Sequence, residues 1–90
     1  MIDPNAVREN LDEWLQNPSW ADIYNGAPSE ACRKYIAMMF YASETEEDEA
    51  FEKLDELESC LLIDDLKYMM ANSAGPEKAR LAKKIAALEK

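Results

Sequence analysis

The sequence contains no histidine, the residue that most often serves as a general base or a metal ligand in proteins. Its two glycines, Gly26 and Gly75, stand alone, so no glycine-rich phosphate-binding loop is present. Asp64 and Asp65 offer paired carboxylates, but we expect both on an outer face, without the desolvation that catalytic carboxylates need. We therefore expect that the protein is not an enzyme and uses no cofactor.

Residues that favour β-strands are also scarce. Valine and threonine each occur once, at Val7 and Thr45, and isoleucine occurs five times. Alanine, leucine, glutamate, lysine and methionine, which favour helices, dominate instead. With 90 residues, 48% of them hydrophobic, the chain has enough apolar surface for one modest core. The sequence predicts one all-α domain over residues 1–90.

Long hydrophobic runs are missing as well. The longest, Tyr35 to Ala42, has eight residues, whereas a membrane-spanning helix needs about 20. The first ten residues, MIDPNAVREN, lack the basic patch and apolar stretch of a secretory signal. We therefore expect a cytoplasmic protein without membrane association, in which Cys32 and Cys60 are reduced and buried.

Proline and glycine, though few, mark where helices begin and end. Asp3 followed by Pro4 has the pattern of an N-cap and a first helical residue. Gly26 and Gly75 suit left-handed residues that close a helix. These signals predict a compact bundle of four main helices plus one short helix, at about residues 19–26.

Residues 28–42 have the widest apolar arc in the sequence. Their hydrophobic side chains cover about half of a helical circumference, which is wider than the stripe of an ordinary surface helix. The pattern predicts that this helix lies at the centre of the bundle. Tyr41 falls on the polar strip beside Arg33 and Lys34, so we expect it to be exposed. Four methionines are expected in the core rather than in an adaptable groove: Met38, Met39, Met69 and Met70.

The stretch ASETEEDEAFEKLDELES, residues 42–59, contains nine acidic side chains. Ser43 and Thr45 can cap a helix here, and acidic residues in a first turn interact favourably with the helix dipole. An apolar stripe follows at helical spacing, so the stretch predicts an amphipathic helix. Its outer side carries the residues that we call the acidic face: Glu49, Glu52, Asp55 and Glu56.

This acidic stretch does not have the pattern of a calcium loop. Read from Ser43, it has aspartate where the loop needs glycine and leucine where it needs a bidentate glutamate, so we expect no specific metal. The net charge is −9, and residues 1–75 carry 17 acidic but only 5 basic side chains. Such a charge repels phosphate and attracts basic proteins, so we expect no direct binding of nucleic acid.

The region around residues 14–43 contains Trp14, Trp20, Tyr24 and the segments APSEAC, KYIA and FYASE. In these features it resembles small accessory proteins encoded on conjugative elements of Firmicutes. The resemblance covers about a third of the chain and includes no catalytic motif. It implies a helical, cytoplasmic bacterial protein, and it carries over no site residue.

The sequence as a whole predicts a small acidic interaction or regulatory protein that works through protein–protein contacts. The acidic face is its predicted partner-binding surface, and a basic partner would be attracted to it. Two alternatives stay open. The acidic face could mimic nucleic acid and inhibit a nucleic-acid enzyme, or the protein could be a structural subunit of a larger complex. The sequence does not specify an oligomeric state.

Overall fold

The computed structural model describes residues 2–89, which contain six α-helices and no β-strand. The helices are α1 (Pro4–Trp14), α2 (Pro18–Asn25), α3 (Glu30–Thr45), α4 (Asp48–Glu58), α5 (Ile63–Ala71) and α6 (Gly75–Leu88). The all-α prediction is confirmed over this range. The predicted total of four main helices plus one short helix is wrong. Each segment between two turns forms a separate helix, including the nine-residue α5.

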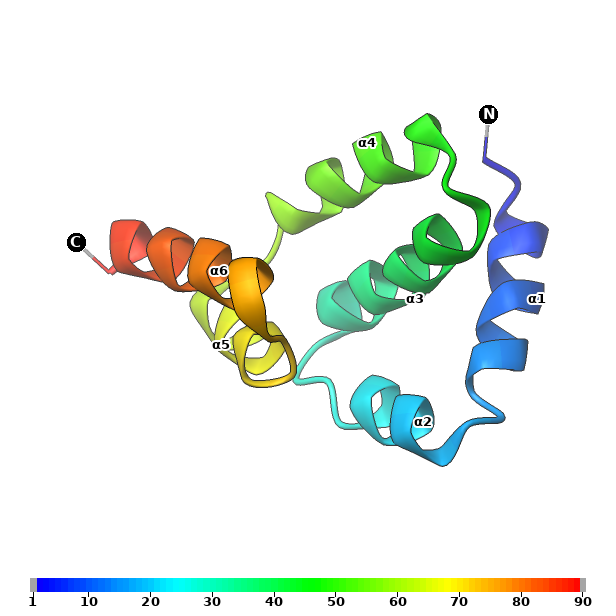
Figure 1. The fold of residues 1–90 in the computed structure, drawn as a ribbon, viewed down its shortest axis with the longest axis horizontal. Helices are drawn as coiled ribbons and strands as arrows, with labels where there is room; N and C mark the ends of the chain where they lie inside the picture. The colour runs from blue at the N-terminus through cyan, green and yellow to red at the C-terminus, as the bar shows by residue number, and fades with distance from the viewer. Residues whose placement is uncertain (1, 90) are drawn as a thin grey trace.

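Helix α3 lies inside the molecule, and α1, α2 and α4 pack around it (Figure 1). The wide apolar arc predicted for this segment is indeed buried, through eight residues: Cys32, Tyr35, Ile36, Ala37, Met38, Phe40, Tyr41 and Ala42. Helices α5 and α6 pack against each other as a hairpin on one side of the molecule (Figure 1). The hairpin completes the core with Leu66, Leu81 and Ile85.

Three aromatic rings join α1 and α2 to α3. The rings of Trp14 and Phe40 are stacked, with centroids 4.5 Å apart, and Trp20 packs against both. Aromatic pairs of this kind add to the stabilisation that burial provides. The methionines occupy the core as expected: Met38 and Met69 are buried, and Met39 and Met70 pack against the core as half-buried residues.

Tyr41 is only 8% exposed, so the expectation that it faces solvent is wrong. It belongs to a second core cluster with Met38, Ala42 and Ala50. Ala42 on α3 and Ala50 on α4 are both almost fully buried, and their small side chains allow the two helices to approach closely. A helical wheel gives the angular position of Tyr41, but it does not show how many neighbouring helices surround that position.

The turn between α3 and α4 differs from the prediction. Ser43 and Thr45 lie within α3 and do not cap α4. Glu46 then reverses the chain in the left-handed conformation, with φ of 55°. The Thr45 hydroxyl instead donates a hydrogen bond of 2.8 Å to the Tyr41 carbonyl, because a hydroxyl in the last turn of a helix can reach the carbonyl four residues earlier.

Glycine is required at the two glycine positions for different structural reasons. Gly75 has φ of +62°, which confirms the left-handed prediction. Gly26 has φ of −83°, so the same prediction is wrong there. At Gly26 the constraint is contact, because a Cβ atom would lie 2.9 Å from the Tyr68 hydroxyl oxygen. That hydroxyl donates a hydrogen bond to the carbonyl of Ile23, which connects α5 to α2.

Candidate functional site

The acidic face lies along one side of α4. Its four side chains are all exposed, and they occupy positions that place them on adjacent turns of the helix. The other side of α4 packs against the core through buried Ala50 and half-buried Leu54 and Leu57. The fold therefore brings the four predicted carboxylates together on one solvated surface.

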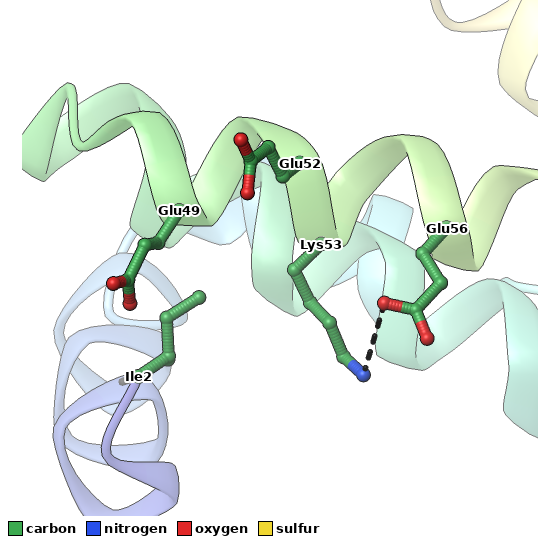
Figure 2. Close-up of a pocket in the computed structure, with 5 residues that line it drawn as sticks. All are labelled: Ile2, Glu49, Glu52, Lys53 and Glu56. Atoms are coloured by element: carbon green, nitrogen blue, oxygen red, sulfur yellow. Dashed lines mark ion pairs between the residues drawn. The ribbon is translucent and has the colours of Figure 1, made fainter.

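Lys53 interrupts this negative surface. Its Nζ atom lies 3.6 Å from Glu56 Oε2, and the two side chains are 45% and 70% exposed. An ion pair as exposed as this contributes little stability, so it can open at small cost. Figure 2 shows the pair together with Glu49, Glu52 and Ile2, which line a shallow depression of about 390 Å³.

The carboxylates of Glu49, Glu52 and Glu56 do not converge on a common point (Figure 2). Among residues 2–89, no group of three or more potential protein ligands is arranged to hold a metal ion. Solvated carboxylates spread along a helix also differ from the desolvated pocket in which catalytic carboxylates lie. What the arrangement provides is a local negative field, which acts on a charged partner at a distance. No helix in the same range is long and apolar enough to span a membrane.

Glu58, the last acid of the stretch, does not belong to this surface. It is 5% exposed, and its Oε1 atom accepts a hydrogen bond of 2.7 Å from Arg80 Nη1. Its Oε2 atom lies 3.8 Å from Lys84 Nζ. Sequence reasoning missed this inward position, although position 58 follows buried Ala50 and half-buried Leu54 at spacings typical of one helix face. Glu58 therefore joins α4 to α6.

The surroundings of Glu58 shift the pKa of two neighbours. Hydrogen bonds from the Arg80 guanidinium to Glu77, and then to Glu58, raise the pKa of Arg80 further above its usual range. Burial, and then the charge of Glu58, raise the pKa of the Tyr35 phenol to about 12. The site is therefore a charged cluster at an interface between helices, next to a phenol that stays protonated at neutral pH.

Asp65 makes a second buried polar connection. It is 2% exposed, so the expectation that it lies on an outer face is wrong. Its carboxylate accepts hydrogen bonds from the Ser29 hydroxyl at 2.7 Å and from the Leu62 amide at 3.0 Å. Ser29 also caps α3 by accepting a hydrogen bond from the Cys32 amide. Asp64 is exposed, so the two neighbouring aspartates lie in different surroundings.

The two cysteines are free thiols in different surroundings. Cys32 is buried as expected, and its pKa is raised to about 11 by burial and by the charge of Asp65. Its thiol therefore stays protonated and is a poor nucleophile. Cys60 is exposed, and the expectation that it is buried is wrong, because it lies in the turn that follows α4.

No family model matches the chain, and neither the curated proteins nor the solved structures compared with it contain a match. The resemblance to accessory proteins of conjugative elements stays a prediction. The functional argument therefore depends on the residues of this chain alone.

Proposed function

We propose that this protein acts through protein–protein contacts and that the acidic face of α4 attracts a basic partner. The observation that carries the proposal is the exposure of all four carboxylates on one side of one helix. Two of them, Glu52 and Asp55, form no ion pair with any other residue between 2 and 89. Their charge is thus available to an approaching molecule.

The contrast with the inward-facing acids supports this proposal. Glu58 and Asp65 are each buried and bonded to partners that hold the fold together. Glu52 and Asp55 have no comparable structural role, and the pair that Glu56 forms with Lys53 is exposed. A net charge of −9 adds a long-range field of the same sign. Such a field mainly increases the rate of association with a basic surface, and salt weakens the effect.

A peptide-display selection against the folded protein tests the proposal even while the partner is unidentified. We expect enriched peptides to carry lysine and arginine. Their affinity should decrease about tenfold in the variant E49Q/E52Q/E56Q, and its salt dependence should become flatter. Glutamine is also a good helix former, so α4 should stay folded. The matched control is E9Q/D12Q/E13Q, which removes three exposed charges from α1 instead.

Several results would contradict the proposal. Enriched peptides that bind both variants equally would mean that the acidic face is only a solvated surface. Saturable binding of calcium or magnesium in calorimetry would make it a metal site. If the wild-type protein inhibited a nuclease and the E49Q/E52Q/E56Q variant did not, the result would favour nucleic-acid mimicry. Self-association that persists at high salt would favour a structural subunit.

A further inference from the structure

A second surface of the protein has the opposite charge. An open groove of about 550 Å³ runs between α1, α3 and α4. Each helix contributes one basic side chain and at least one apolar side chain to its lining: Arg8 with Pro4 and Val7 from α1, Lys34 with Ala37 and Met38 from α3, and Lys53 with Leu57 from α4. Figure 1 shows that α1 and α4 both lie beside α3, so the groove has a wall from each neighbour and a floor from the central helix.

The charge of the groove is unusual for this molecule. Every ionisable side chain that lines it is basic, although the chain has a net charge of −9. Residues 1–75 contain only 5 basic residues, and three of them meet here. The fold therefore places three basic side chains, which are distant in the sequence, around one apolar groove.

These cations are poorly neutralised within the protein. Arg8 and Lys34 form no ion pair with any other residue between 2 and 89. Lys53 has only the exposed contact with Glu56 in the same range. A carboxylate on a docking partner can therefore approach all three without displacing a buried ion pair. Met38 lines the groove from the second core cluster, so a bound partner would extend that cluster.

We propose that this groove binds an amphipathic helical segment of a partner protein, with apolar residues facing the groove and acidic residues along both edges. Helices recognise grooves in this way through apolar anchors spaced one turn apart. The basic rim selects acidic edges, because a lysine-edged helix would meet three like charges. The groove shares only Ile2 and Lys53 with the depression beside the acidic face, so the inference does not depend on the function proposed above.

The test uses two synthetic helical peptides that share leucine anchors, one edged with glutamate and the other with lysine. Fluorescence anisotropy should show saturable binding of the glutamate peptide and at least tenfold weaker binding of the lysine peptide. The variant R8Q/K34Q should bind the glutamate peptide about tenfold more weakly. The matched control K78Q/K83Q changes the net charge equally on α6, and it should bind as the wild type does.

Methyl-labelled methionine gives an independent readout that locates the peptide. The Met38 signal should shift on titration, and the signal of Met70, which lines a separate groove between α5 and α6, should not. The proposal would be overturned if the glutamate peptide showed no saturable binding, or if R8Q/K34Q and K78Q/K83Q weakened its binding equally. It would also be overturned if the peptide shifted the Met70 signal instead of the Met38 signal. The same holds if the fatty acid dodecanoate bound saturably at the groove while the peptide did not, since the occupant would then be a lipid. Dimerisation that R8Q/K34Q abolishes would also overturn it, since the occupant would then be a second copy of the chain.

Discussion

The core around α3 is held on its two sides by different kinds of contact. Towards α1, α2 and α4 the contacts are mainly apolar, with the stacked rings of Trp14 and Phe40 and the close approach of α4 at Ala50. Towards the α5–α6 hairpin, apolar packing is supplemented by buried polar connections. Glu58 of α4 bonds to Arg80 of α6, and Asp65 of α5 bonds to the hydroxyl of Ser29, which caps α3. On one side of the core, stability thus comes mainly from apolar packing. On the other side it comes from apolar packing together with buried charged and polar contacts.

This difference predicts where the protein responds to its conditions. Apolar packing changes little with pH, whereas a buried ion pair is strong only while both partners stay charged and correctly placed. Buried polar contacts also make a docked arrangement more specific, because a shifted hairpin would leave charges without partners. Helices α5 and α6 pack mainly against each other rather than against the other helices. We therefore expect the hairpin to detach before the rest of the fold unfolds.

The largest expected effect comes from removing one buried side chain on each side. Phe40→Ala should lower the free energy of unfolding by roughly 3–5 kcal/mol and Leu81→Ala by roughly 2–5 kcal/mol, since both side chains are almost fully buried. Urea melts measure both changes. Hydrogen exchange should increase throughout the protein for Phe40→Ala but chiefly in α5 and α6 for Leu81→Ala. Identical exchange patterns would contradict the proposed difference between the two sides.

The next effect concerns the polar connection of the hairpin. Arg80→Gln should cost about 1–3 kcal/mol, because it leaves the carboxylate of Glu58 buried with only the more distant Lys84. Glu77→Gln is the control, since it removes the exposed partner of the same arginine and should cost less than about 1 kcal/mol. Thermal melts of both variants show whether the ion pair between Arg80 and Glu58 stabilises the fold. Equal costs would mean that the burial of Glu58 has no energetic consequence.

Alkaline pH should weaken the same interface. The pKa values of Cys32 and Tyr35 are raised in the folded protein to about 11 and about 12, so both groups bind protons more tightly when folded. Their stabilising contribution is complete below the unfolded values of about 9 and about 10, and it is lost as pH rises through the folded values. By about pH 11 the loss should be roughly 2 kcal/mol for Cys32 and roughly 1 kcal/mol for Tyr35. Urea midpoints measured against pH should show the decline, and Cys32→Ala with Tyr35→Phe should flatten it.

The smallest effects are expected on the acidic face. Glu52→Gln and Asp55→Asn should each change stability by less than about 0.5 kcal/mol, because both side chains are exposed and have no ion pair among the described residues. Moderate NaCl should raise the melting temperature slightly by screening a net charge of −9. A melting temperature that decreases with salt would mean that the attraction between α4 and α6 outweighs this repulsion.

The features that sequence reasoning located correctly depend on local signals. The Asp3 side chain accepts a hydrogen bond from the Asn5 amide, as an N-cap should, and Gly75 has the positive φ that its position predicts. The acidic face also follows from helical periodicity alone. A pattern with a period of one helical turn needs no information about distant residues.

The features that it missed depend on residues far away in the chain. Glu58 is buried because Arg80, 22 residues later, meets it. Asp65 is buried because Ser29, 36 residues earlier, lies beside it. The basic rim of the groove brings together single residues from three helices, each of which is an ordinary exposed cation in its own segment. Apart from the helical spacing that places Glu58 on the inner face of α4, no local pattern contains this information, since it arises only when the helices pack.

The close approach of Gly26 and Tyr68 has a consequence for how this sequence can diverge. The hydroxyl that reaches Ile23 occupies the space that a side chain at position 26 would need. The two positions are therefore not free to vary independently, although 42 residues separate them in the chain. A descendant that acquires alanine at position 26 is expected to acquire a shorter residue at position 68 as well. Paired changes at these positions would trace the contact between α2 and α5 through sequences alone.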